Sequence, residues 1–144
     1  MAKKTKDLRL WHEFRRAHSR ATTNLENEML DRMGFPLIWF DTLHHLSEAP
    51  RNKLRLQDLA DKLLFSRSGL TRLVDRIEEA GLVEREPDQQ DRRGISAVLT
   101  SAGLQTHREA VSTYDKVIES HFLGPLNTGD RKALRSALRK VLST

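Results

Sequence analysis

Apolar side chains recur every three or four residues along most of this chain, which is the spacing of amphipathic helices. The first such stretch covers residues 8–30, where the apolar positions are Leu10, Phe14, Ala17, Ala21 and Leu25. Gly34 then breaks the pattern, and Pro36 suits the first turn of a second helix that ends before Pro50. The sequence therefore predicts a long helix followed by a shorter one.

The middle of the chain predicts two further helices separated by a short turn. Residues 56–63 carry apolar side chains on one side, although Arg55 is a poor N-cap for them. Ser66 is a favourable N-cap for the next helix, which we expect to end at Gly81. The buried stripe of that helix is expected to consist of Leu70, Leu73, Val74, Ile77 and Ala80.

After Gly81 the apolar period changes from 3.6 to 2, which indicates β-strands. Residues 82–86 and 95–99 are predicted to form the two strands of a hairpin, joined by the polar loop 87–94. Two more helices follow, one from Thr100 or Ser101 to Gly124 and one over about 128–142. The predicted fold class is therefore mainly α with a small β-wing.

The order of helix, turn, helix and hairpin over about residues 51–100 is that of a winged helix-turn-helix. The exposed face of the helix that follows Ser66 changes in charge along its length. Its first turns carry Arg67, Ser68, Thr71 and Arg72, and its last turns carry Asp75, Glu78 and Glu79. A helix that enters a DNA major groove by its N-terminal end needs donors at that end. The alternative is a solvated face, but its i,i+4 neighbours are like-charged and do not stabilise a helix.

The tip of the predicted hairpin carries the second feature that points to DNA. Asp91, Arg92 and Arg93 precede Gly94 there. Guanidinium groups at a hairpin tip can enter a narrow minor groove, where the negative potential is strong. Asp91 is expected to accept hydrogen bonds from one arginine and from amides of the loop. An ordinary charged hairpin tip is the alternative at this position.

Charge and composition allow a nucleic-acid partner and exclude several other classes of site. The formal net charge is +5, although basic and acidic residues almost balance between Arg51 and Arg93. DNA binding there depends on individually placed arginines rather than on bulk charge. The chain has no cysteine, which excludes disulfides, thiolate metal ligands and thiol redox switches. No apolar run is long enough to cross a membrane and no secretory signal is visible, so we expect a cytoplasmic protein.

The middle of the chain resembles the MarR (multiple antibiotic resistance regulator) family of winged helix-turn-helix transcriptional regulators. The resemblance rests on two motifs and their spacing, the run from Ser66 to Arg76 and the run from Asp91 to Gly94, followed by Leu99-Thr100-Ser101-Ala102-Gly103. It implies one domain over residues 1–144, with a helical dimerisation region at about 1–50 and 101–144. It implies a homodimer that binds a pseudo-palindromic operator in double-stranded DNA and that most simply acts as a repressor.

The resemblance also assigns roles to individual residues. It places Ser66, Arg67, Ser68, Thr71, Arg72 and Arg76 at the major groove. It places the wing with Asp91, Arg92 and Arg93 at the minor groove, where Arg93 enters and Asp91 orients it. These roles are expectations carried over from the family.

A small aromatic or anionic effector is a further expectation from the resemblance. The aromatic and cationic residues of the first two helices that suit it are Trp11, His12, Arg15, Arg16, Trp39, Phe40, His44 and His45. Packing in the core or at a dimer contact is the alternative for the aromatic members of this set. An aromatic acid would stack on tryptophan and pair with arginine or histidine.

Three other functions are weighed against this one. A zinc-responsive regulator of the same fold is an alternative, but His44 and His45 are adjacent and point in different directions, so we assign no metal ligand and no cofactor. A winged helix used only for protein contacts is the second alternative. An enzyme is not expected, because the sequence has no nucleophile elbow, P-loop or glycine-rich dinucleotide turn.

Overall fold

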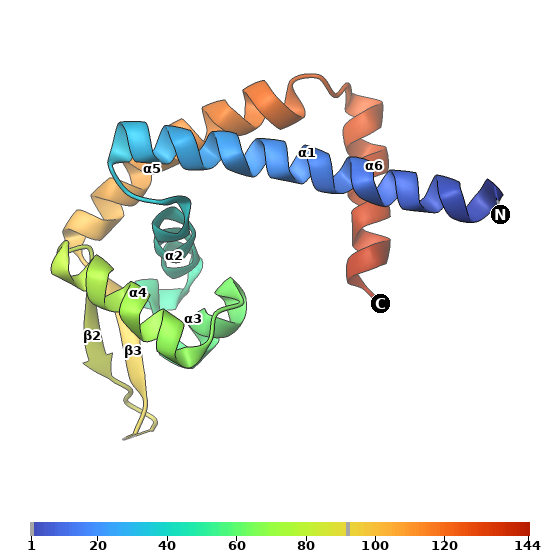
Figure 1. Ribbon diagram of the computed structural model, residues 1–144. Coiled ribbons are helices and arrows are strands. Elements are labelled where there is room, and N and C mark those ends of the chain that lie inside the picture. Colours follow the sequence, from blue (N-terminus) through green and yellow to red (C-terminus); the bar gives the residue numbers. More distant parts are fainter. Residues whose placement is uncertain (1, 92) are drawn as a thin grey trace. The chain divides into compact units, whose positions relative to one another are not determined.

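The computed structural model describes residues 2–91 and 93–144, with side chains described from residue 8 onward. Helices predominate, as the sequence predicts. The chain divides into two compact units, one formed by the residues up to Arg32 together with Thr113–Thr144, and one formed by Met33–Ser112. Figure 1 shows the helices and strands along the chain. Among the described residues, no helix is long and apolar enough to span a membrane.

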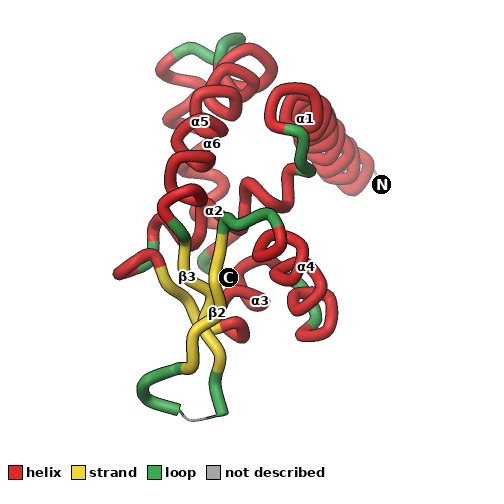
Figure 2. Tube along the Cα trace, turned by 90° about the vertical axis from the view of Figure 1, so that its left-hand side faces the viewer, coloured by secondary structure: helices red, strands yellow, loops and turns green. Residues whose placement is uncertain are grey.

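The second unit contains the winged helix-turn-helix that the sequence predicts. In chain order it comprises α2 (Leu37–Glu48), a 3-10 turn (Pro50–Asn52), β1 (Lys53–Arg55), α3 (Leu56–Leu63), α4 (Arg67–Glu79), β2 (Val83–Pro87), β3 (Ile95–Leu99) and the first part of α5 (Ser101–Ile118). The described strands form an antiparallel sheet in the order β1-β3-β2. Figure 2 shows β2 and β3 as the hairpin of the wing.

The helix boundaries around the central turn follow from local chemistry. The side chain of Ser66 accepts a hydrogen bond from the Gly69 amide at 3.1 Å, which caps α4 as predicted. Leu64 adopts a left-handed conformation with φ of 57°, which ends α3 and turns the chain toward α4. Gly81, with φ of 79°, ends α4 in the conformation that glycine adopts most readily.

Several details differ from the prediction. The segment 53–55, which looks like a polar link in the sequence, forms β1 and pairs with Ser96–Val98 of β3. Three residues are too few to show a strand period, so only the partner strand reveals this element. Strand β2 starts at Val83 rather than Leu82, and Ala80 at the end of α4 is exposed instead of belonging to the buried stripe.

The core of the second unit lies between its helices and its sheet. The remaining predicted stripe of α4 is buried there together with apolar side chains of α2, α3, β2 and β3. The members with the least exposed surface are Leu43, Leu46, Leu59, Leu70, Val74, Ile77, Val83 and Ala97. This packing holds α4 against the sheet and leaves its opposite face exposed.

The first unit consists of long helices. It contains α1 (Ala2–Met33), the end of α5, a π-helical turn (Glu119–Leu123) and α6 (Thr128–Leu142). Helix α6 begins with a capping box, in which Asn127 and Asp130 exchange side-chain to backbone hydrogen bonds. On α1, Ala21, Leu25 and Met29 are buried, whereas the residues toward the N-terminus that continue the predicted stripe are exposed.

Candidate nucleic-acid interface

The N-terminal half of α4 presents a row of exposed donors. Each of the residues that the sequence assigns to the major groove is exposed, namely Ser66, Arg67, Ser68, Thr71, Arg72 and Arg76. The opposite face of the helix is buried in the core. This arrangement leaves arginine and hydroxyl side chains at the positive end of the helix dipole, where anionic groups are stabilised.

Two of the hydroxyl groups on this face already make intramolecular hydrogen bonds. The Ser66 oxygen is the helix cap and accepts from the Gly69 amide. The Thr71 hydroxyl donates to the Arg67 carbonyl at 2.9 Å, so its oxygen remains available as an acceptor. Ser66 therefore has a structural role in addition to any DNA contact, and Thr71 offers a lone pair and a methyl group.

A groove of about 270 Å³ separates the start of α4 from the wing. Arginine residues from three segments line it, together with two aspartates. The lining residues are Arg55, Leu56, Gln57, Arg67, Leu70, Thr71, Asp88, Asp91, Arg93, Gly94 and Ile95. On one side, the Arg67 guanidinium donates to the Gln57 side-chain oxygen at 3.1 Å. The motifs do not reveal Arg55 and Gln57 as site residues, because both precede the turn and belong to β1 and α3.

The loop of the wing is organised by aspartate side chains. The Asp91 carboxylate accepts from the Arg93 amide at 3.0 Å, as expected for a residue that shapes this loop. The Asp88 amide donates to the Gly94 carbonyl at 2.8 Å, and the Asp88 carboxylate forms an ion pair with Arg55. Arg93 is exposed. Arg92, which the sequence also assigns to the wing, lies outside the described residues.

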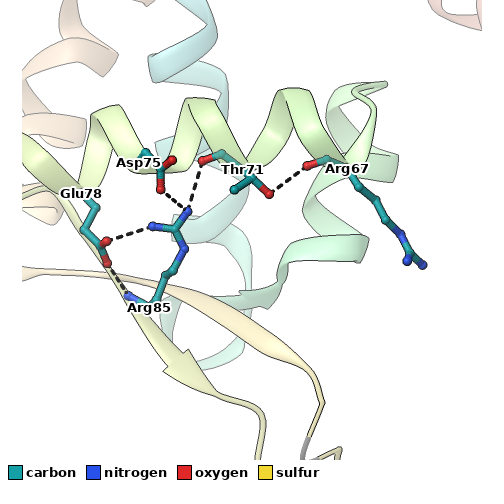
Figure 3. A network of polar contacts seen from close by, with 5 residues as sticks. All are labelled: Arg67, Thr71, Asp75, Glu78 and Arg85. Atoms are coloured by element: carbon teal, nitrogen blue, oxygen red, sulfur yellow. Dashed lines mark hydrogen bonds and ion pairs between the residues drawn. The ribbon is translucent and has the colours of Figure 1, made fainter.

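Arg85 of β2 makes a network of polar contacts with α4, shown in Figure 3. Its guanidinium donates to the Glu78 carboxylate at 2.9 Å, the Asp75 carboxylate at 2.6 Å and the Thr71 carbonyl at 3.1 Å. Its amide donates to the second Glu78 oxygen at 2.9 Å. No motif in the sequence identifies Arg85. The available signal is the strand period, which places it on the same face as the buried Val83.

The fold that carries these residues is shared with known transcriptional regulators. The sequence model of the MarR family matches residues 33–94. AbsC, a MarR family transcriptional regulator from Streptomyces coelicolor, is 31% identical, and its crystal structure matches with a TM-score of 0.88 over 96% of this chain and 93% of that one. This chain belongs to the MarR family.

Two further relatives of this MarR family member are informative. Sco3205 from Streptomyces coelicolor, a MarR family transcriptional regulator crystallised in complex with DNA, is 27% identical, with a TM-score of 0.88 over 96% of this chain and 86% of that one. The transcriptional repressor MprA of Escherichia coli strain K12 is 28% identical over 81% of this chain, and the match spans 66% of the length of MprA. These relatives are named as transcriptional regulators and not as enzymes, which agrees with the sequence-based expectation.

The residues that the sequence assigns to an effector pocket fall into two groups in this MarR family chain. Trp11, His12, Arg15 and Arg16 lie on α1 in the first unit, where the Trp11 ring stacks on Phe14. Trp39, Phe40, His44 and His45 lie on α2 in the second unit. Trp39 stacks on Phe35, which precedes α2, and within α2 Phe40 stacks on His44. The aromatic residues assigned to the pocket therefore stack on other rings within their own unit.

A histidine pair joins α2 to α5 within the second unit. The His44 Nδ1 atom lies 3.1 Å from the His107 Nε2 atom, and the Phe40 ring stacks against both imidazoles. Burial lowers the pKa of His107, and the neighbouring His44 lowers it further. Burial also lowers the pKa of His45. Among the described residues, no group of three or more histidine or acidic side chains is arranged to hold a metal ion.

Proposed function

We propose that this chain is a sequence-specific transcriptional regulator that binds double-stranded DNA. The observation that carries the proposal is the exposed, arginine-rich start of α4 beside the wing with Arg93, across one groove lined by Arg55, Arg67 and Arg93. Donors on α4 suit the edges of bases in a major groove. Arginine at the wing suits the adjacent minor groove. The DNA complex of the relative Sco3205 supports this assignment.

The proposal includes a homodimer that binds a pseudo-palindromic operator. In the first unit, the exposed apolar side chains Leu10, Trp11, Phe14, Val141 and Leu142 belong to α1 and α6. Exposed apolar surface of this kind is typical of a protein–protein contact. Two copies of α4 would then enter successive major grooves about one helical turn apart.

Repression by occlusion of a promoter is the simplest consequence of such binding, and the relative MprA is named as a repressor. An aromatic or anionic effector that binds among Trp11, His12, Arg15 and Arg16 or among Trp39, Phe40, His44 and His45 would shift the population of DNA-binding conformers. This regulation depends on a difference in effector affinity between conformers, so it is measurable as a change in operator affinity.

The test measures binding of the full chain to DNA from its own upstream region, or to sites selected from a random library, over a series of salt concentrations. The wild type should bind specific sites tightly with a steep salt dependence, and Arg93→Ala should lose about 1–3 kcal/mol of binding free energy. Arg108→Ala on α5 removes the same charge at an exposed position that does not line the groove, and it serves as the control.

Two results would contradict the proposal. Failure to select any preferred DNA sequence from the library would refute sequence-specific binding. Equal losses for Arg93→Ala and Arg108→Ala would show that the wing contributes only bulk charge. A winged helix used for protein contacts would then be the better explanation.

A further inference from the structure

The side chain of Arg85 connects the wing to the middle of α4. It reaches three acceptors that span two turns of the helix, the Thr71 carbonyl, the Asp75 carboxylate and the Glu78 carboxylate, at distances between 2.6 and 3.1 Å. Only 21% of its side chain is exposed, so solvent competes weakly for these contacts. Figure 3 shows the guanidinium between the strand and the helix.

The strand geometry explains why Arg85 faces α4 and its neighbour does not. Arg85 shares a face of β2 with Val83, which is buried, and pairs in register with Ala97 of β3. Glu86, the next residue, points to the other face. There its carboxylate accepts from the Lys53 ammonium of β1 at 2.9 Å. The ion pairs of Arg85 therefore link β2 to α4, whereas the ion pair of Glu86 links two strands of the sheet.

The position of the contacts gives Arg85 access to both parts of the interface. Thr71 lies in the exposed half of α4 that carries Arg67 and Arg72, and its carbonyl is the acceptor nearest to that end. At the other end, β2 leads directly into the loop that contains Arg93. A planar guanidinium has five donors in a fixed geometry and can serve several acceptors at once, which a lysine ammonium on a flexible stem does not reproduce.

We propose that Arg85 is a positioning residue for DNA recognition, which fixes the wing relative to α4 so that one half-site is held in both grooves at once. The inference rests on the proposed function and deepens it. The major and minor grooves of a duplex lie at a fixed separation. The contacts of α4 and of the wing therefore reinforce each other only if these two elements keep a matching separation. Arg85 supplies that constraint without contacting the DNA.

Neutralisation of Asp75 and Glu78 is the competing role for the same side chain. Unpaired carboxylates on α4 would repel the phosphate backbone, and any cation at position 85 would reduce that repulsion. Arg85→Lys separates the two roles because it keeps the charge and removes the planar arrangement of donors.

The test measures affinity for a selected operator with four proteins: wild type, Arg85→Lys, Arg93→Ala and the double variant. We expect Arg85→Lys to weaken specific binding about tenfold while non-specific binding is unchanged. In the Arg85→Lys background, Arg93→Ala should cost clearly less than it does in the wild type, since the wing no longer engages together with α4. Glu86→Gln, which breaks the neighbouring ion pair within the sheet, should bind like the wild type.

Asp75→Asn provides a second variant in case Arg85→Lys does not fold. It replaces a charged acceptor of the Arg85 guanidinium by a neutral amide oxygen, which holds the guanidinium more weakly, and it leaves the Glu78 contacts in place. It also removes a negative charge from α4. Positioning predicts weaker specific binding, whereas loss of a repulsive charge alone predicts tighter binding. The two roles therefore predict opposite signs for this variant.

Several outcomes would overturn the inference while leaving the proposed function intact. These are wild-type affinity for Arg85→Lys, equal costs of Arg93→Ala in both backgrounds, or tighter binding by Asp75→Asn. A wild-type protein that selects no operator would instead refute the proposed function itself. The two failures are therefore distinguishable in one set of titrations.

Discussion

An intramolecular hydrogen bond of Thr71 restricts which base atoms its side chain can bind. Its hydroxyl proton is donated to the Arg67 carbonyl, so the oxygen faces a partner as an acceptor. The amino groups of adenine and cytosine are the donors that a major groove offers to such an acceptor. Thr71 is therefore expected to contact an amino group or a thymine methyl group and not a guanine acceptor.

Replacing Thr71 by valine removes this oxygen and retains the branched shape of the side chain. If Thr71 accepts from a base, Thr71→Val should lose about 1 kcal/mol of specific binding free energy and relax the preference at one base pair, while non-specific affinity stays the same. Selection from a library with the position randomised would measure this change. Thr22→Val is the matched control, because Thr22 makes the same bond to the His18 carbonyl on α1. An unaltered sequence preference would place Thr71 outside the set of base-contacting residues.

The sequence predicts which residues of α4 are exposed, but it does not predict the side-chain contacts between different elements. The exposure of Arg67, Ser68, Thr71 and Arg72 follows from the helix period, because the apolar stripe determines which side faces the core. The contacts of Arg85 and the Arg67–Gln57 hydrogen bond do not follow from any local pattern. They depend on which elements pack against one another.

At the scale of the elements, α2 and α5 are joined by two imidazoles whose nearest nitrogens are 3.1 Å apart. One nitrogen of such a pair must accept, so at least one ring is neutral when the bond forms. Burial, His44 and Arg108 lower the pKa of His107, while Glu48 raises it. The folded protein therefore binds a proton at His107 less readily than the unfolded chain does.

The sign of the resulting pH dependence follows from proton linkage. Below the ordinary histidine pKa of 6.5, the unfolded chain binds a proton at His107 more readily than the folded protein does. The contribution of His107 to the free energy of unfolding therefore falls as pH falls from there toward its lowered pKa. The lowered pKa of His45 acts in the same direction. His107→Phe keeps a ring beside Phe40 and removes one titrating group, so the decline should become shallower.

Urea denaturation at fixed protein concentration between pH 8 and pH 5 would measure this effect. Ser112→Ala, at an exposed position of α5 that does not titrate, is the control and should leave the slope unchanged. A slope for His107→Phe as steep as that of the wild type would remove His107 from the account of acid sensitivity.

The junction between β3 and α5 shows why the motif Leu99-Thr100-Ser101-Ala102-Gly103 has its composition. The Thr100 hydroxyl donates to the Gly81 carbonyl at 2.6 Å and accepts from the Gly103 amide at 3.0 Å. A Cβ atom on Gly103 would lie 2.0 Å from the Leu82 carbonyl oxygen, so only glycine fits there. The capping threonine is visible in the sequence, whereas the close approach of the backbone is not.

At the scale of the whole molecule, the first unit leaves large apolar side chains in water. Leu10 is 67% exposed, Phe14 is 44% exposed and Leu142 is 85% exposed. None of the side chains of α6, a helix described in full, is buried. We predict that these surfaces form the homodimer contact, because an amphipathic helix is stabilised mainly by burial of its apolar face.

Phe14→Glu should weaken the homodimer by about 2 kcal/mol or more, since it places a charge where an aromatic ring is expected to be buried. Sedimentation over a range of protein concentrations would measure the dissociation constant, and operator affinity should fall in parallel. Gln105→Glu on α5 introduces the same charge in the second unit and is the control. A monomeric wild type, or a Phe14→Glu variant that dimerises normally, would contradict this prediction.

Local patterns in the sequence are sufficient to predict the helices, the cap at Ser66, the turn at 64–66 and the hairpin, because each depends on side chains within a few residues of one another. The helix period also predicts the exposed donors of α4. Tertiary packing is needed for the pairing of β1 with β3, the His44–His107 contact and the contacts of Arg85 with α4. These contacts join residues far apart in the chain, and their geometry exists only after the elements have packed, so no local pattern can specify them.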